Sequence, residues 1–314
     1  MKLHTLISQY VGWRQSLGER YKSQRDILNS FCRRIGPEVD AAEIQPEQVS
    51  AFLAGAGPIT LTWHNKYHTL KGFYHYALSR KYLTASPLPT TVPKRPRPLV
   101  PYIYSTEELQ RLLAAAYTYQ KRRESLEPET VHTILLLLYG AGLRVSEALS
   151  LTLADVDLRQ AVLTIRDSKF FTSRLIPVGK QLNDSLKKYE SHRLTAGHPQ
   201  SEDRPFFVKR NGQPVNIFNL ENAYRRILKQ TGISRTDVAG RRPRLHDLRH
   251  AFAVHRLIAW YQEGKDVQQL LPQLSVYLGH RRLADTSTYL TMTPELLRHA
   301  SQLFEQYALK GGFQ

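Results

Sequence analysis

The sequence predicts a mostly α-helical protein of two domains, with a small antiparallel β-sheet in the second domain. Three observations support this fold class. Apolar residues recur at helical spacing along most of the 314 residues, a proline-rich stretch interrupts them, and two strand-like runs stand close together beyond it. A chain of this length is long enough for each of two domains to bury a core of its own.

Residues 1–83 are expected to form a compact, all-helical domain. Apolar residues recur at helical spacing in two runs within residues 3–35. A short helix is expected over residues 45–53, where Pro46 suits a first turn, and a longer one over residues 63–83. Together these helices predict a single small core.

The segment 84–104 is expected to be an extended linker between the domains. Proline occurs at positions 87, 89, 93, 96 and 98, interleaved with basic residues, and proline at this density favours a semi-rigid, extended chain. The basic side chains either follow a phosphate backbone or stay in solvent, and both interpretations fit the sequence. In either case the segment marks the domain boundary.

Residues 105–314 are expected to form the second domain, which begins with an N-cap signature at Ser105. Helices are predicted over residues 130–139, 143–149, 182–193 and 217–230. Glycines 140 and 142 allow a tight turn that places Arg144 at the head of a short helix, where free backbone N–H groups also favour an anion. An arginine that is merely exposed there is the weaker interpretation.

The runs 161–166 and 174–178 read as two strands of a β-hairpin, and Lys169 lies in the connection between them. By itself, this residue is as easily a solvated loop lysine as a functional one. Further along, arginines accumulate between positions 225 and 244, so the approach to residue 245 is strongly basic. The second domain therefore combines helices, a small sheet and a concentration of positive charge.

A helix is also expected where His246 and Arg249 lie three residues apart. Residues at this spacing share one face, so both side chains can point one way while Leu245, Leu248 and Phe252 pack on the other. A guanidinium group holds phosphate oxygens through two parallel hydrogen bonds. An amphipathic helix with a solvated basic face explains this segment equally well when it is considered alone.

The composition points to a polyanionic partner. The chain has 44 Lys and Arg against 27 Asp and Glu, a formal charge of +17. DNA, RNA and an anionic membrane surface would all attract it, but no apolar run approaches the roughly 20 residues of a spanning helix, and a cytoplasmic protein is expected.

The single cysteine, Cys32, excludes a disulfide framework and a cysteine-cluster zinc site. In the absence of a Gly-rich phosphate loop and of an HExxH motif, neither a nucleotide cofactor nor a metal is expected.

Four short motifs occur in order along the back two thirds of the chain: Gly142-Leu143-Arg144-Val145-Ser146-Glu147, His246-Asp247-Leu248-Arg249-His250, Leu278-Gly279-His280 and Tyr289. They resemble the Arg, HxxR, LGH and Tyr boxes of the tyrosine recombinase (phage integrase) family. The resemblance implies a C-shaped, two-domain DNA clamp. In it, residues 1–83 are the core-binding domain and residues 105–314 are the catalytic domain with a C-terminal docking helix.

The resemblance also implies a site-specific recombinase that cleaves and rejoins DNA through a 3′-phosphotyrosine intermediate. Tyr289 is then the nucleophile, and Arg144 and Arg249 clamp the non-bridging oxygens of the phosphate. The hairpin lysine of the family aligns with Lys169, which would protonate the departing 5′-oxygen. The six expected catalytic residues are Arg144, Lys169, His246, Arg249, His280 and Tyr289.

The two histidines of the motifs, His246 and His280, are expected to hydrogen-bond the scissile phosphate, and His246 can also take the proton of the tyrosine. Glu147 and Asp247 are expected to orient the arginine and histidine side chains. His250, which follows the HxxR box directly, is expected to have a structural or supporting role. No metal ligand is expected among these residues.

The family resemblance implies double-stranded DNA as partner, with a homo-tetramer, or a hetero-oligomer with related recombinases, assembled on two sites and DNA-bending accessory proteins as further candidates. An apolar stripe over residues 294–309 would dock on a neighbouring protomer or pack on its own domain. The stretch 258–272 is longer than in compact relatives that resolve chromosome dimers. This length favours integration or excision of a mobile element, although dimer resolution and transposition stay open.

Two other functions are compatible with the motifs. A type IB topoisomerase-like enzyme would nick and reseal one duplex by the same chemistry, and a DNA-binding regulator would keep the fold without catalysis. The helical first domain and the candidate docking helix favour recombination over relaxation. The presence of all six active-site residue types argues against a non-catalytic regulator.

Overall fold

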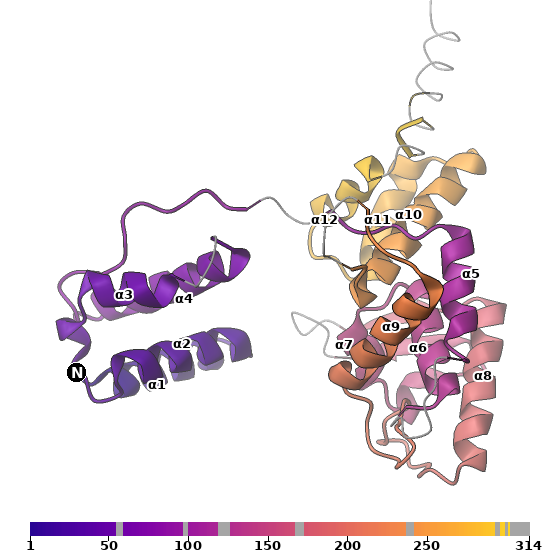
Figure 1. The fold of residues 1–314 in the computed structure, drawn as a ribbon, viewed down its shortest axis with the longest axis horizontal. Helices are drawn as coiled ribbons and strands as arrows, with labels where there is room; N and C mark the ends of the chain where they lie inside the picture. The colour runs from indigo at the N-terminus through magenta and orange to yellow at the C-terminus, as the bar shows by residue number, and fades with distance from the viewer. Residues whose placement is uncertain are drawn as a thin grey trace, which may run out of the picture. The chain divides into compact units, whose positions relative to one another are not determined.

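The computed structural model describes residues 1–54, 59–96, 100–118, 126–166, 173–236, 242–292, 296–298 and 301. The chain divides into two compact units, Met1–Leu99 and Val100–Gln314 (Figure 1). Within the described residues both units are mainly helical, and the second holds one three-stranded antiparallel sheet. The predicted fold class, mostly α with a small antiparallel sheet, is therefore confirmed.

The first unit is built from short amphipathic helices around one core. Its described elements are α1 (Leu3–Ser16), α2 (Lys22–Ile35), the 3₁₀ turn η1 (Ala41–Glu43), α3 (Pro46–Leu53) and α4 (Leu61–Ser79). Leu28, Phe31 and Phe73 are fully buried where these helices face one another. The helix expected over residues 63–83 is in fact shifted to 61–79, because Lys81 adopts a left-handed φ of 60° that turns the chain out of the helix.

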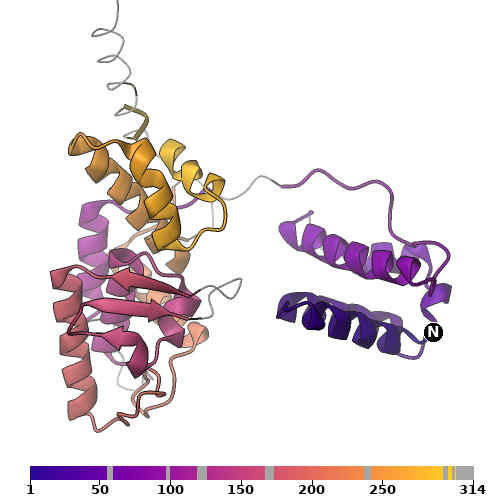
Figure 2. The same cartoon turned by 180° about the vertical axis from the view of Figure 1, so that it is seen from behind.

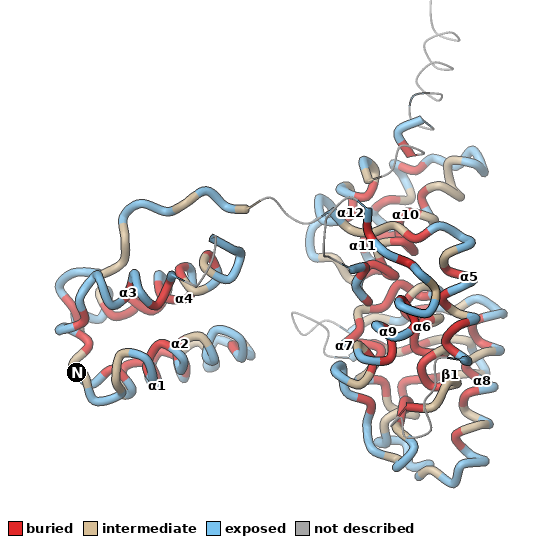
Figure 3. The backbone as a smooth tube through the Cα atoms, viewed as in Figure 1, coloured by how far each residue is buried: buried red, intermediate tan, exposed pale blue. Residues whose placement is uncertain are grey.

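The second unit is organised around α6, whose apolar residues are buried on nearly every side. Its described helices and 3₁₀ turns are α5 (Thr106–Ala115), α6 (Pro128–Gly140), α7 (Val145–Ser150), η2 (Leu153–Asp155), α8 (Lys180–Thr195), α9 (Ile217–Thr231), α10 (Leu245–Gln262), α11 (Val267–Leu278), α12 (Ala284–Ser287) and η3 (Thr288–Thr291). Helix α6 packs against α5, α8 and α10. Figure 3 shows the buried positions on the facing sides of the helices in each unit.

The N-cap predicted at Ser105 is confirmed. The Ser105 hydroxyl accepts a hydrogen bond from the Glu108 backbone N–H at 3.2 Å, and the Glu108 carboxylate accepts one from the Ser105 N–H at 3.0 Å. This reciprocal capping box satisfies two backbone donors that helix α5 leaves free. Further along, α8 and α9 confirm the helices predicted over residues 182–193 and 217–230.

The sheet has the strand order β1-β2-β3, with β1 at Val156–Asp157, β2 at Val162–Ile165 and β3 at Arg174–Pro177 (Figure 2). Strands β2 and β3 pair antiparallel, and Ile165 lies opposite Arg174. This confirms the predicted hairpin, while the two-residue strand β1 was not predicted. The connection 167–172, and with it Lys169, lies outside the described residues.

The apolar stripe expected over residues 294–309 also lies almost wholly outside the described residues. Of the described part, Leu296 is buried in the cluster that contains Tyr289, whereas Leu297 is 51% exposed. Among the helices that the structure describes, none has the length and apolar character needed to cross a membrane.

Candidate active site

The turn between α6 and α7 places Arg144 at the N-cap of α7, as the sequence predicts. Gly142 has a left-handed φ of 59°, and a Cβ atom there would lie 2.4 Å from Cδ1 of Phe252, so only glycine fits. The chain then becomes extended at Arg144, whose backbone N–H donates to Glu147 Oε2 at 3.0 Å. From this position the Arg144 side chain extends to the end of α11, where Nη2 contacts the Gly279 carbonyl.

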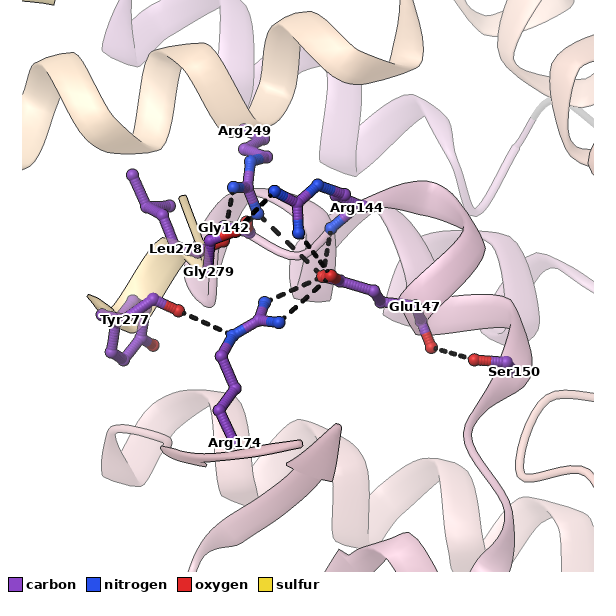
Figure 4. Close-up of polar contacts among 9 residues, drawn as sticks. All are labelled: Gly142, Arg144, Glu147, Ser150, Arg174, Arg249, Tyr277, Leu278 and Gly279. Carbon is purple, nitrogen blue, oxygen red and sulfur yellow. Dashed lines mark hydrogen bonds and ion pairs between the residues drawn. The ribbon is translucent and has the colours of Figure 1, made fainter. Parts of the chain in front are cut away.

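Three arginines converge on the carboxylate of Glu147, which is 5% exposed (Figure 4). Arg144 Nη1 donates to Oε1 at 2.6 Å, and Arg174 donates through Nη1 at 3.1 Å and Nη2 at 2.9 Å. Arg249 Nη1 lies 4.0 Å from Oε2. Burial by itself would raise the pKa of Glu147, but the hydrogen bonds and charges of Arg174 and Arg144 outweigh it and lower that pKa to about 2.

Arg249 is buried, with 1% of its surface exposed, and its guanidinium group is held by backbone carbonyls. Nη1 donates to Gly142 O at 2.7 Å and Nη2 donates to Leu278 O at 2.6 Å. Burial, followed by the charge of Arg144, lowers the pKa of Arg249 to about 10, so the group stays cationic at neutral pH. Arg249 therefore joins the turn before α7, helix α10 and the end of α11.

His246 and Arg249, which the i,i+3 spacing predicts on one face of α10, differ in burial. His246 is accessible to solvent, whereas Arg249 is enclosed beside Leu248, which is fully buried. Tertiary packing explains the difference, because the turn at Gly142 and the end of α11 cover α10 at position 249 but leave position 246 uncovered. Desolvation, followed by the charges of Arg249 and Arg244, lowers the pKa of His246 to about 4, so its ring is neutral near pH 7.

His280 is positioned by the end of α11. Gly279 caps this helix with a left-handed φ of 66°, and the His280 N–H donates to Ser275 O at 2.9 Å. Nδ1 of His280 lies 2.7 Å from the hydroxyl of Thr286, which is fully buried. The carbonyl of Gly279 accepts from Arg144 Nη2 at 2.8 Å, so the predicted LGH box and the predicted arginine are in direct contact.

Tyr289 lies in η3 and is 2% exposed, with its hydroxyl 3.0 Å from Nδ1 of His250. Its ring is stacked with that of His280, with ring centroids 6.1 Å apart. Burial raises the pKa of Tyr289, and the positive charges of Arg249 and Arg144 offset only part of this rise. The phenol is therefore neutral in the DNA-free protein, and a base is needed to activate it.

Asp247 does not orient the histidines as expected, because it is engaged at the start of its own helix. The fully buried carboxylate accepts from the Arg244 backbone N–H at 2.8 Å and from Arg244 Nη2 at 2.8 Å. It thereby caps α10 and holds Arg244 in place. Glu147, in contrast, contacts Arg144 as the sequence analysis expected.

The model of the phage integrase family matches residues 104–295, which include all four motifs. The chain belongs to the phage integrase family. The relative y4rB, a candidate integrase/recombinase of Sinorhizobium fredii, is 34% identical over 304 residues, 96% of each chain. Tyrosine recombinase XerA of Thermococcus kodakarensis is 34% identical over 211 residues, 67% of this chain and 64% of XerA.

Solved structures of family members share the fold of this integrase-family chain. The Tn1549 transposon integrase in complex with transposon right end DNA has a TM-score of 0.70 at 16% identity, over 98% of this chain and 100% of the other. A lambda integrase dimer bound to a COC′ core site gives a TM-score of 0.67 at 18% identity, over 94% and 97% of the two chains. The family assignment makes the chain a tyrosine-type site-specific recombinase.

The recombinase brings five of its six expected catalytic residues into one region of the second unit, where α7, α10, the end of α11 and η3 meet. Lys169, the sixth, lies outside the described residues. Three guanidinium groups and one carboxylate meet there, so positive charge is in excess and an anion such as a phosphodiester is favoured. Among the described residues, no group of three His, Cys, Asp or Glu side chains is arranged to hold a metal ion.

Contacts of two residues in the recombinase site were not predicted from the sequence. Arg174 entered only as the start of a predicted strand, although its side chain reaches Glu147. His250 was expected to have a structural or supporting role, and its contact with the Tyr289 hydroxyl was not predicted. The contact of Arg174 could have been predicted from its position, because it is a cation at the first residue of an otherwise apolar strand, and a buried charge needs a partner of opposite charge.

Proposed function

We propose that this recombinase cleaves and rejoins double-stranded DNA through a 3′-phosphotyrosine formed by Tyr289, to integrate or excise a mobile element. The observation that carries the proposal is the position of the Tyr289 phenol, which is enclosed next to a histidine and beside the buried guanidinium of Arg249. A buried nucleophile next to a base and a surplus of fixed cations is suited to attack on a phosphodiester.

In the proposed reaction the Tyr289 oxygen attacks the scissile phosphorus, the new P–O bond forms, and the bond from phosphorus to the 5′-oxygen breaks. Arg144 and Arg249 bind the non-bridging oxygens and stabilise the charge of the transition state. His280, stacked on the Tyr289 ring, hydrogen-bonds the same phosphate. The reverse attack by a 5′-hydroxyl from a second duplex then rejoins the strands without an external energy source.

Two proton transfers accompany the reaction, one from the Tyr289 hydroxyl and one to the departing 5′-oxygen. The phenolic proton goes to a neutral imidazole. Nδ1 of His250 lies 3.0 Å from the Tyr289 hydroxyl. The ring of the solvent-accessible His246 is next to that of His250, with ring centroids 4.7 Å apart. We assign the proton for the departing 5′-oxygen to Lys169, on the family alignment of the β2–β3 hairpin. Both histidines have a lowered pKa, so each ring is neutral at pH 7 and has a nitrogen lone pair available, although each is a weaker base than free histidine.

We assign DNA binding to both units. The first unit and the basic segment 84–104 serve as the core-binding domain and linker, and phosphate contacts from their cations supply affinity without base information. The active assembly is a homo-tetramer on two DNA sites, in which residues beyond 301 contact a neighbouring protomer. We assign this reaction to the cytoplasm. Support for DNA as the partner comes from the net charge of +17 and from the family's solved DNA complexes.

The function is tested by trapping the covalent intermediate. Nicked duplexes from the DNA that flanks the gene are incubated with the wild-type protein, with Tyr289→Phe, and with Tyr139→Phe as a matched control. Tyr139 also places its hydroxyl 3.0 Å from a histidine of α10, His255, but it lies outside the set of catalytic candidates. We expect a 3′-linked adduct with the wild type and with Tyr139→Phe, and none with Tyr289→Phe.

The possible results of this experiment separate the candidate functions. An adduct that survives in Tyr289→Phe would assign the nucleophile to another residue. Adducts accompanied by relaxation of supercoiled DNA, but by no joined products from two duplexes, would support the type IB topoisomerase-like alternative. Tight binding of the flanking DNA without any adduct would support a non-catalytic DNA-binding protein.

A further inference from the structure

Arg174 directs all the donor atoms of its guanidinium group into the protein. Nε donates to the Tyr277 carbonyl at 3.0 Å, while Nη1 and Nη2 form a two-pronged contact with Glu147 at 3.1 and 2.9 Å. The side chain is only 11% exposed. From the first residue of β3, it therefore reaches both α7 and the end of α11 (Figure 4).

Through Glu147, Arg174 influences the availability of Arg144. The same carboxylate accepts from both arginines, and Arg174 is the leading favourable cause of its low pKa. If Arg174 were absent, Glu147 would keep only Arg144 and the more distant Arg249 as cationic partners, and its negative charge would hold the Arg144 guanidinium group more tightly. Arg174 thus neutralises part of the negative charge of Glu147. Arg144 is then less fully neutralised by Glu147 and can still attract a phosphate oxygen.

Arg174 also lies directly against the turn that leads to His280. A Cβ atom at Gly279 would be 2.8 Å from Nη1 and 2.9 Å from Cζ of Arg174, so the guanidinium plane packs on the bare glycine backbone. The Gly279 carbonyl in turn receives Arg144 Nη2. One side chain therefore supports both neighbours of the expected phosphate position, Arg144 and His280.

We propose that Arg174 is a positioning residue of the catalytic site, which shares Glu147 with Arg144 and supports the Gly279 turn so that Arg144 and His280 face the scissile phosphate. This role rests on the proposed function of the site. We assign Arg174 no contact with the phosphate, because its side chain is 11% exposed and each of its three nitrogens already donates to Glu147 or Tyr277. Its contribution is the alignment of groups that do, and the planar, five-donor shape of arginine is required for it.

The test compares Arg174→Gln and Arg174→Lys with Arg166→Gln. Arg166 is the matched control, because it flanks the same hairpin and also forms an ion pair with a buried carboxylate, that of Asp155 and not that of Glu147. Each variant is assayed for the rate of adduct formation on a nicked duplex. The scissile position carries either the natural phosphodiester or a methylphosphonate, which lacks one non-bridging oxygen and the negative charge.

We expect Arg174→Gln to slow adduct formation on the phosphodiester by about 10- to 100-fold, because misplacement of a reacting group by about 1 Å can cost about 100-fold in rate. On the methylphosphonate the loss should be several-fold smaller, because the charge that Arg144 must neutralise is absent. Arg174→Lys should recover only part of the rate, since lysine cannot form the two-pronged contact with Glu147. Arg166→Gln should stay close to the wild-type rate on both substrates.

Other outcomes would overturn the proposal in distinguishable ways. Equal losses on the two substrates in Arg174→Gln would indicate a general structural defect in place of alignment of Arg144. Equal rates in Arg174→Gln and Arg166→Gln, with an active wild type, would contradict the proposed role of Arg174 and leave the proposed function of Tyr289 intact. Lack of adduct in the wild type would contradict the proposed function of Tyr289 and this role together.

Discussion

At the scale of single residues, the site is defined by buried groups whose protonation is set by their surroundings. His250 contacts the Tyr289 hydroxyl, and burial, followed by the charges of His246 and Arg244, lowers the pKa of its ring to about 3. Burial also raises the pKa of Tyr289. A neutral imidazole thus faces a neutral phenol at pH 7, which is the starting state that proton transfer to the histidine requires.

The lowered pKa of His250 predicts a pH dependence of stability. Above about pH 6.5, the ordinary pKa of histidine, the ring is neutral in both the folded and the unfolded protein. As the pH falls below that value, the unfolded state takes up a proton while the folded state does not, so the free energy of unfolding decreases. We expect the unfolding midpoint of His250→Gln to fall less than that of the wild type between pH 7.5 and pH 5.

Thermal unfolding at several pH values measures this difference, with the exposed His75→Gln as control. The control should follow the wild-type pH profile. Parallel profiles for His250→Gln and the wild type would show that His250 is not held neutral in the folded protein. Because the comparison uses the slope with pH, a constant loss of stability in the variant does not affect it.

The residue types of the site were predictable from the sequence, but their environments were not. Arg144 follows a local glycine turn, and its place at the start of α7 could be read from neighbouring residues. The burial of Arg249 and the contact of His250 with Tyr289 depend on chain segments that meet only in the folded protein, and the last two residues are 39 positions apart. Spacing along one helix cannot specify what another helix covers.

At the scale of elements, glycine turns decide where the catalytic side chains lie. The turn at Gly142 passes against Phe252 of α10, and its carbonyl holds Arg249. Local signals of this kind made α5, α6 and the β2–β3 hairpin predictable, because capping residues and periodicity are properties of short segments. The strand β1 has only two residues, too few for any pattern, and its place depends on pairing with β2.

Replacement of Gly142 tests how tightly α7 is held to α10. In Gly142→Ala the new methyl group would meet Cδ1 of Phe252 at 2.4 Å, and the φ of 59° is unfavourable for alanine. Left-handed strain of about 1 kcal/mol and overpacking of roughly 1–3 kcal/mol should together lower the free energy of unfolding by about 2 kcal/mol or more. Urea unfolding measures this change.

Gly179→Ala provides the comparison for that measurement, since a Cβ atom at Gly179 meets nothing within 4 Å and its φ is an ordinary −68°. We expect its urea midpoint to stay close to that of the wild type. Equal midpoints for the two alanine variants would mean that the turn at Gly142 relaxes without cost, and that its glycine is not needed to place Arg144.

At the scale of the whole molecule, two units and a C-terminal segment have separate tasks in the proposed recombinase. Leu296 is fully buried in the cluster around Tyr289, so the start of the C-terminal segment packs on its own protomer. A truncation meant to test contact between protomers must therefore keep this residue. Removal of residues 302–314 meets that condition.

We expect the protein without residues 302–314 to fold and to bind a single DNA site with unchanged affinity, but not to form a tetramer on paired sites. The physical reason is that apolar residues at helical spacing in the removed segment would have their partner surface on another protomer. Native mass measurement of complexes with one-site and two-site DNA separates the two steps. A complete tetramer from the truncated protein would rule out this contribution of the C-terminal segment.

The arginines of the site are anchored largely by the main chain. Carbonyl oxygens of Gly142, Tyr277, Leu278 and Gly279 accept four of their hydrogen bonds. A carbonyl keeps its place whichever side chain it belongs to, so the amino acid at position 277 can vary without loss of its anchor. Variability there among relatives would consequently be no sign of unimportance, and alanine scanning would overlook the contacts that hold the reactive centre together.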